Sequence, residues 1–381
     1  MLDQMTFLTR LFKLADQLPP SLAMDLARLK KALSLLGTSE KDLGLRGLSP
    51  SAQLAELNKY FGNRLGGSTA EARAAVADLM TRADEVLPPE IVRAGPSLSG
   101  SNAQAVRAGG CTDLGAGLST QQVSDIHRHL EGRPLLLALD AHAAKQSVAS
   151  LSDVPAGQSY ACHEYVDLWS SPHIMELATS ERILDMAQDY LRCVPTLYSM
   201  NAFWSFPKRE PHPYSQLFHR DWEDYRSLVA FTQLTPVDIP EDGAHYYVEG
   251  SHDVATFEGI LQARNVSGEE VELLSSRDGP AIASIAERLF SQTARRFDGP
   301  AGRSFCSDGY GLHRAVVPHS QPRLLLWIRF GTFYNSTMYR MAVTSKNRQA
   351  AQAILQRIPD TPRHRYVFRY LIDALTDRTG S

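Results

Sequence analysis

The spacing of hydrophobic positions changes twice along the chain and divides it into three regions. From residue 1 to about residue 94, apolar side chains recur at helical spacing, as in Phe7, Leu11 and Leu14. Short β-rich runs cut by turns follow between about residues 197 and 334, and helical spacing returns in the tail. We therefore expect helices at both ends of the chain and a sheet between them.

Local signals refine this division. Strands are expected at residues 197–206, 227–234, 245–248, 303–306 and 323–333, and many short strands around one core favour a barrel or jelly roll. The pair Ser119 and Gln122 has capping-box spacing and predicts a helix that ends near Gly132.

The small residues of the segment 95–101 make it the best linker candidate, because they lack the bulk to pack and leave the backbone free. We expect a helical N-terminal region over residues 1–95, a β-rich core over 96–345 and a helical tail over 346–381.

Composition places the protein among soluble globular proteins. The chain has 381 residues, of which 43% are hydrophobic and 21% charged, so collagen-like, disordered and low-complexity classes are excluded. The 39 Lys and Arg residues nearly balance the 42 Asp and Glu residues. That balance argues against a dedicated nucleic-acid or anionic-membrane surface, which would need a clustered basic excess.

Cysteine usage and the N-terminus bear on the compartment. The four cysteines lie far apart without Cys-x-x-Cys spacing, so neither a disulfide framework nor a zinc knuckle is indicated. No signal peptide and no continuous apolar run of membrane-spanning length is visible. We expect a cytoplasmic protein without a membrane or nucleic-acid partner, and its oligomeric state stays open.

Two His-x-acid pairs could contribute metal ligands. His129 and Glu131 lie at the end of a helical pattern, where positions i and i+2 point in very different directions. His219 and Asp221 instead lead into a β-type run, where i and i+2 project from one face and can reach the same ion. We therefore interpret His129 as a helix-surface residue and take His219 and Asp221 as candidate ligands.

A third ligand and a cation would complete an iron site. Two imidazoles and one carboxylate on one face of an octahedral iron(II) leave three positions open, and His313, at a plausible strand start, is the candidate for the second imidazole. Arg323, ten residues later, could grip a carboxylate from the neighbouring strand. Arg329 lies on the same strand face and is its rival, with an exposed or ion-paired role as the alternative.

A series of short motifs runs through the β-rich part of the chain, and they are Gln-Leu-Phe-His-Arg-Asp at 216–221, Glu-Asp-Gly-Ala at 241–244, Val-Glu-Gly-Ser-His at 248–252, Gly-Pro-Ala-Gly at 299–302, His313 and Arg323. With these motifs in this order, the chain over about residues 105–335 resembles the phytanoyl-CoA dioxygenase-like (PhyH-like) branch of the iron(II)- and 2-oxoglutarate-dependent oxygenases. The resemblance implies an α+β fold with a double-stranded β-helix (jelly-roll) core, flanking helices and an N-terminal helical region.

The resemblance also implies roles for single residues. His219, Asp221 and His313 would hold Fe(II), and Arg323 would pair with the distal carboxylate of 2-oxoglutarate. With O2 as the other cosubstrate, such an enzyme hydroxylates a small or medium-sized organic molecule and releases succinate and CO2. Desaturation or cyclisation stays open, whereas the presence of Asp221 disfavours chlorination, because halogenating members carry a small residue there.

Weaker candidates each have a structural alternative. Gln216 could contact 2-oxoglutarate or substrate, or be a solvated strand-edge residue. Asn201 and Trp204 could line the pocket, although tryptophan more often packs in a core. The polar loop with Lys208, Arg209 and His212 could meet an anionic substrate group or be solvated. His252 is interpreted as a turn residue, and Cys162-His163-Glu164 as structural because adjacent side chains diverge.

Two other functions stay open at this point. The first is a non-enzymatic jelly-roll binding module with a vestigial or structural metal site. The second is a cupin-like metalloenzyme that uses no cosubstrate.

Overall fold

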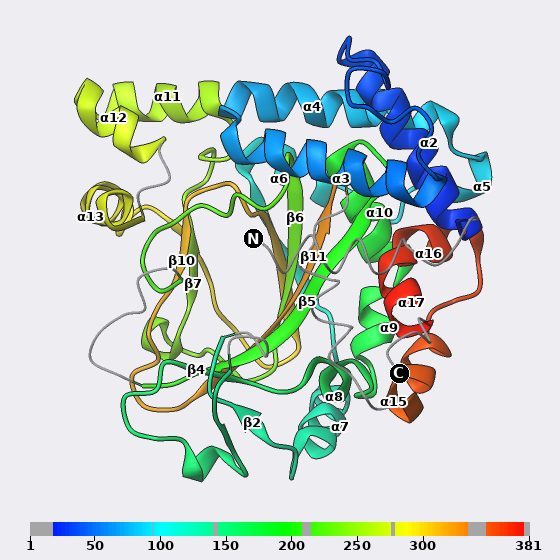
Figure 1. Cartoon of the computed structure of the whole chain (residues 1–381). Coiled ribbons are helices and arrows are strands. Elements are labelled where there is room, and N and C mark those ends of the chain that lie inside the picture. The colour runs from blue at the N-terminus through cyan, green and yellow to red at the C-terminus, as the bar shows by residue number, and fades with distance from the viewer. Residues whose placement is uncertain are drawn as a thin grey trace.

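The computed structural model describes residues 18–93, 95–139, 144–207, 215–275, 279–333 and 348–376, and it combines helices with antiparallel strands (Figure 1). The α-helices in these ranges are α2 (Pro20–Leu35), α3 (Pro50–Gly67), α4 (Ala70–Ala83), α5 (Pro89–Val92), α6 (Asn102–Gly109), α7 (Thr120–Leu130), α8 (Tyr165–Trp169), α9 (Ile174–Ala178), α10 (Glu181–Leu191), α11 (Val254–Ala263), α12 (Gly268–Leu274), α13 (Gly279–Phe290), α15 (Arg348–Leu355), α16 (Pro362–Val367) and α17 (Arg369–Thr376). The strands are β1 (Cys111–Ala116), β2 (Leu135–Leu136), β3 (Ser147–Val148), β4 (Tyr160–Cys162), β5 (Thr196–Ser205), β6 (Ser227–Gln233), β7 (His245–Tyr247), β8 (Arg295–Phe297), β9 (Arg303–Asp308), β10 (His313–Ala315) and β11 (Arg323–Gly331). Within the same ranges, no helix has the length and apolar character needed to cross a membrane.

The strands form two antiparallel sheets. The larger sheet has the order β1-β9-β6-β11-β5-β4-β2-β3, and the smaller one has the order β10-β7-β8. All five runs that the sequence pattern predicts as strands are confirmed, as β5, β6, β7, β9 and β11. The long strand β11 lies between β5 and β6, so the residues after position 323 reach the centre of the larger sheet.

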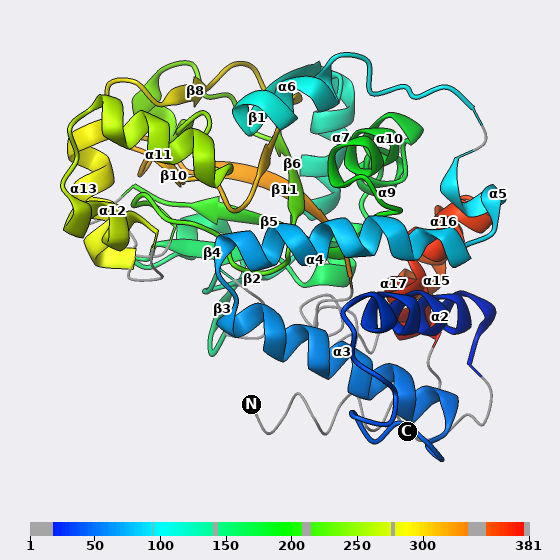
Figure 2. The same cartoon turned by 90° about the horizontal axis from the view of Figure 1, so that it is seen from above.

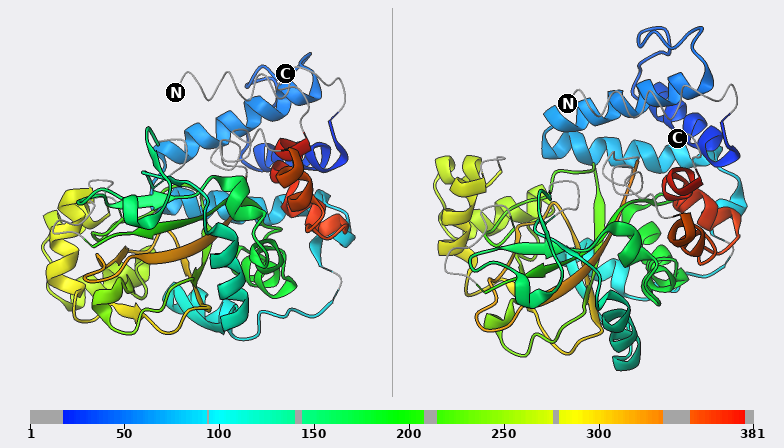
Figure 3. Two further views of the ribbon diagram at one scale, coloured as in Figure 1. Left: turned by 90° about the horizontal axis from the view of Figure 1, so that it is seen from below. Right: turned by 60° about the horizontal axis from the view of Figure 1, so that its bottom comes forward.

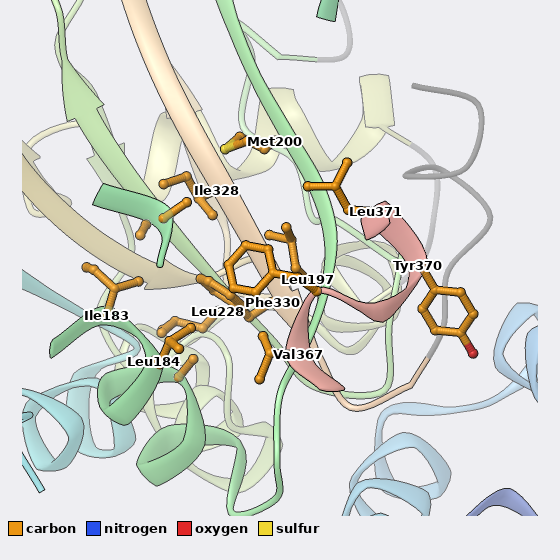
Figure 4. Packing of buried hydrophobic residues seen from close by; sticks show 14 of the residues in the cluster. Ile183, Leu184, Leu197, Met200, Leu228, Ile328, Phe330, Val367, Tyr370 and Leu371 are labelled. Carbon is orange, nitrogen blue, oxygen red and sulfur yellow. The ribbon is translucent and has the colours of Figure 1, made fainter. Parts of the chain in front are cut away.

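The two faces of the larger sheet have different neighbours. On β11, Leu324, Leu326 and Ile328 face the helices and belong to the main hydrophobic core, which Figure 4 shows around β5, β6 and the helices α10, α16 and α17. The alternate residues Leu325 and Trp327 join a second cluster with aromatic side chains of both sheets. This alternation gives β11 one face in the main core and one face toward the smaller sheet.

The N-terminal and C-terminal helices pack together on the outside of the larger sheet (Figures 2 and 3). Helix α2 packs against α3 and α4, and α16 packs against α2 and β5. Asp25 of α2 and Arg369 of α17 form a fully buried ion pair at 2.8 Å, and Arg369 also donates to Thr196 of β5 at 2.9 Å. Buried charges of this kind need their partners, so the two ends of the chain stabilise each other.

The short segment after the N-terminal helices differs from the expectation of a free linker. Ser99 is buried and donates to Asp189 of α10 at 2.6 Å, and the backbone N–H of Leu98 donates to Asp185 at 2.7 Å. The expectation was wrong for this stretch because two carboxylates, distant in sequence, accept its hydrogen bonds. By contrast, the capping box of Ser119 and Gln122 is confirmed at the start of α7.

Candidate metal centre

The structure brings His219, Asp221 and His313 together. Their potential ligand atoms all lie within 4.8 Å of one another, and no other such group of three or more His, Cys, Asp or Glu occurs in the described part of the chain. The Nε2 atom of His219 is 3.8 Å from Oδ1 of Asp221, and that of His313 is 3.9 Å from Oδ2. Two imidazole nitrogens and one carboxylate oxygen thus converge from positions about ninety residues apart in the chain.

Backbone pairing explains this convergence. His219 and His313 form an antiparallel bridge, with N–H···O distances of 3.0 and 3.1 Å, and the N–H of Asp221 donates to the carbonyl of Gly309 at 2.8 Å. A Cβ at Gly309 would lie 3.2 Å from the Cβ of Asp221, so glycine permits this close approach. His219 therefore lies on a single bridge rather than in the regular strand that the sequence pattern indicated, and Asp221 follows in an irregular segment.

Both histidines are oriented by their second ring nitrogen. The Nδ1–H of His219 donates to the carbonyl of Leu217, and that of His313 donates to the carbonyl of Gly311, each at 2.8 Å. A carbonyl can only accept, so each Nδ1 carries a proton and the Nε2 side of each ring is turned toward the carboxylate. Metal-binding histidines are commonly fixed in this way.

Charges around the site favour the protonation states that ligands need. Burial opposes ionisation of Asp221, but Arg329, at 3.0 Å, together with His313 and His219 outweighs it and holds the pKa of the carboxyl below its ordinary value. Burial and the neighbouring His219 lower the pKa of His313 to about 4, so that imidazole is neutral at pH 7. An ionised carboxylate and a neutral imidazole are the forms that bind divalent metals.

Arg329 is ion-paired, which is the alternative that the sequence left open for it. Its guanidinium bridges Asp221 and Glu223, and Tyr198 also donates to Glu223 at 3.4 Å. Burial raises the pKa of Glu223 against the effect of Arg329. Arg329 thus fixes Oδ2 of Asp221, and Oδ1 is left facing His219.

Arg323 is buried in a different environment. Its side chain is 3% exposed, it donates to the carbonyl of Gly243, and its Nε and Nη2 have no hydrogen-bond partner within the described ranges. Gly243 has φ +100°, and a Cβ there would lie 3.0 Å from Cδ of Arg323, so this glycine allows the contact. Burial lowers the pKa of Arg323 to about 10, partly offset by Tyr160. A buried guanidinium with unused donors can bind an anion bidentately.

The weaker candidates separate into distinct places. Gln216 is 2% exposed, so the solvated alternative for it is wrong. Asn201 pairs with Trp327 and lies on the face toward the smaller sheet, where its amide donates to the carbonyl of Leu139 at 3.2 Å. Trp204 pairs with Leu324 and lies on the opposite face, in the main core. Trp204 therefore does not line the same space as Asn201.

The remaining candidates lie away from the metal centre or outside the described ranges. His129 is half-buried in α7 and bonds to the carbonyl of Asp167 at 3.0 Å, and His252 bonds to the carbonyl of Arg107 at 3.2 Å. His163 lines a separate cavity. Lys208, Arg209 and His212 fall outside the described residues.

Sequence reasoning missed one polar residue beside the site. His245 of β7 is 4% exposed, and its ring lies 5.5 Å from that of His313. Burial lowers the pKa of His245 well below its ordinary value, with His313, Arg323 and His219 acting in the same direction. The available signal was a histidine at the first position of a predicted strand, two residues after the Gly243 turn.

Comparisons with known proteins find similarity only among solved structures. No protein-family profile and no curated protein matches the chain. EctD from S. alaskensis in its apoform has 18% sequence identity and a TM-score of 0.40, over 64% of this chain and 81% of that one. HygX from Streptomyces hygroscopicus, solved with nickel and 2-oxoglutarate bound, has 15% identity and a TM-score of 0.39, over 62% of this chain and 87% of that one. SnoK, a non-heme alpha ketoglutarate dependent carbocyclase from nogalamycin biosynthesis, has 16% identity and a TM-score of 0.39, over 62% and 87% respectively. At these values the similarity does not assign an activity, which has to be argued from the residues.

Proposed function

We propose that this protein is an Fe(II)- and 2-oxoglutarate-dependent oxygenase that hydroxylates a small or medium-sized organic molecule, with O2 as cosubstrate and succinate and CO2 as coproducts. The observation that carries the proposal is the convergence of two oriented Nε2 atoms and one ionised carboxylate. This donor set suits iron(II) with open coordination positions.

In this proposal each residue has a defined task. His219, Asp221 and His313 hold the ion, which when bound supplies the redox chemistry that couples decarboxylation of 2-oxoglutarate to oxidation of substrate. Arg323 binds the distal carboxylate of 2-oxoglutarate. Arg329 is less suited to that task, because Asp221 and Glu223 already occupy its guanidinium. Gln216, which is buried and lies three residues before His219 in the sequence, is proposed as a further contact of 2-oxoglutarate or substrate.

We extend the proposal to the architecture. The larger and smaller antiparallel sheets would be the two sides of a double-stranded β-helix of the PhyH-like type, within an oxygenase core over residues 96–345. Residues 1–95 and 346–381 would be helical additions to it. The proposed location is the cytoplasm.

The test is an anaerobic titration of the protein with Fe(II) and then with 2-oxoglutarate. We expect a weak visible metal-to-ligand charge-transfer band in the wild type and its loss in His219→Ala. His129→Ala is the matched control, because it removes a half-buried histidine of the other His-x-acid pair, outside the centre. A wild-type protein that binds Fe(II) but shows no band with 2-oxoglutarate would refute the proposal and favour a metalloenzyme without this cosubstrate.

A further inference from the structure

His245 lies beside His313 and two residues after Gly243, which contacts Arg323. Its strand, β7, lies in the middle of the smaller sheet, where His245 pairs with Ala315 and Tyr247 pairs with His313. Directly paired residues and positions i and i+2 share a face, so His245 and His313 project from the same side of this sheet. Their rings are 5.5 Å apart and nearly parallel.

The turn just before this strand contacts Arg323. Gly243, whose carbonyl accepts from the Arg323 guanidinium, lies two residues before His245. Aromatic rings of the larger sheet close the other side, since the His245 ring is 4.9 Å from Phe231 and 5.1 Å from Phe305. A molecule that reaches from the metal ligands to Arg323 would therefore pass beside His245.

The His245 ring has an unused polar atom in this space. The side chain is 4% exposed, and its Nε2 has no hydrogen-bond partner in the part of the chain that the structure describes. Leaving a buried polar atom unpaired costs free energy, so such an atom calls for a ligand that pairs with it. A neutral imidazole offers one N–H donor and one acceptor, which suits a carboxylate oxygen in an otherwise aromatic surrounding.

We propose that His245 is a positioning residue for 2-oxoglutarate, which it contacts through a hydrogen bond from Nε2–H to a carboxylate oxygen. This inference rests on the proposed function and adds to the metal, Arg323 and Gln216 one more group that orients the cosubstrate.

The experiment measures binding rather than turnover. For the wild type, His245→Leu and His245→Gln, the dissociation constant for Fe(II) is determined anaerobically by calorimetry without 2-oxoglutarate, and that for 2-oxoglutarate on the Fe(II)-loaded protein from the charge-transfer band. We expect His245→Leu to weaken 2-oxoglutarate binding about tenfold to a hundredfold, as for loss of one hydrogen bond to a charged group, and to leave Fe(II) binding unchanged. The glutamine variant, whose amide can donate, should recover most of the affinity.

His163→Leu provides the matched control. His163 is also 4% exposed with a ring nitrogen that lacks a partner among the described residues, but it lines a different cavity with His127 and Trp204. Its replacement should leave the affinity for 2-oxoglutarate unchanged.

The outcomes separate this inference from the function on which it rests. If the wild type shows no band with 2-oxoglutarate, the proposed function fails. If the wild type shows the band and His245→Leu binds 2-oxoglutarate as tightly, only the role of His245 is overturned. An equal loss of Fe(II) affinity in His245→Leu would also overturn it, because the ring would then act by supporting His313.

Discussion

Replacing Arg323 by leucine should weaken binding of 2-oxoglutarate while it stabilises the protein without that ligand. The guanidinium is 3% exposed, and Nε and Nη2 have no partner within the described residues. Leucine removes the charge and keeps an apolar side chain in the site. The two effects have opposite signs because the charge is costly until an anion binds to it.

The magnitude follows from the burial of the cation. Burial lowers the pKa of Arg323 to about 10. At about 1.4 kcal/mol per pH unit, this lowering corresponds to a cost on the order of 3 kcal/mol for keeping the group charged. A carboxylate that offsets this cost contributes a similar free energy, which lies within the roughly 2–5 kcal/mol found for truncated buried charge pairs. We therefore expect the dissociation constant for 2-oxoglutarate to rise about a hundredfold.

The assay compares two ligands that differ only at the distal end. Anaerobic titrations with Fe(II) present would measure binding of 2-oxoglutarate and of 2-oxopentanoate, which has the same chain length and a methyl group in place of the distal carboxylate. In Arg323→Leu the affinity for 2-oxoglutarate should fall about a hundredfold and that for 2-oxopentanoate by only a few-fold. Thermal unfolding without ligand should occur at a higher temperature than in the wild type.

Arg314→Leu is the control for this prediction. Arg314 directly follows the metal-ligand candidate His313, but its guanidinium pairs with Glu287 and lies over the ring of Phe218. Its loss should not change 2-oxoglutarate affinity. The assignment of Arg323 to the distal carboxylate would be refuted if Arg323→Leu lost affinity equally for 2-oxoglutarate and 2-oxopentanoate, or if it lost no affinity for 2-oxoglutarate.

Three further predictions concern the surroundings of the centre. Arg329→Met removes the cation between the carboxylates of Asp221 and Glu223, so the dissociation constant for Fe(II) should rise about tenfold to a hundredfold, and an unchanged constant would contradict the positioning role. Burial raises the pKa of Asp224 to about 6, so the folded state keeps this proton where the unfolded state has lost it. The free energy of unfolding should then fall by on the order of 3 kcal/mol as the pH rises from about 4 to 6, and urea titrations of Asp224→Asn should lack this component. Tyr225→Phe deletes a buried hydrogen bond to a backbone carbonyl of α3 at 2.6 Å and should cost about 1 kcal/mol in urea unfolding, whereas an unchanged midpoint would show that the bond contributes nothing.

What the sequence predicts well here is local. The capping box at Ser119 and Gln122 depends on residues three positions apart, and the five strands depend on short runs. The spacing of His219 and Asp221 places both on one side of the chain, while Arg220 between them donates to the carbonyls of Ser251, Leu274 and Tyr310. Alternation of side chains along an extended segment is sufficient to predict that Arg220 points away from His219 and Asp221.

What the sequence does not predict depends on distant partners. Arg323 and Arg329 share one face of β11, so periodicity cannot distinguish their tasks. The difference comes from the irregular segment that begins at Asp221, because the carboxylates of Asp221 and Glu223 pair with Arg329, whereas Arg323 has no carboxylate partner among the described residues. The segment around Ser99 is a second example of this limit. Its small residues are typical of a linker, and the sequence does not show that Asp185 and Asp189 accept hydrogen bonds from it.

The N-terminal helices act on the centre through that same irregular segment. Residues 222–226 lie directly after Asp221 and before β6, outside any helix or strand. The Arg73 guanidinium of α4 lies 5.0 Å from the ring centre of Trp222 and donates to the carbonyl of Asp224, and Tyr225 donates to the carbonyl of Phe61 in α3. A segment without its own ladder of backbone bonds depends on such external contacts for its position. Because Asp221 immediately precedes it, α3 and α4 restrict where the Asp221 carboxylate can lie, which gives the N-terminal region a part in the geometry of the candidate metal centre beyond covering the sheet.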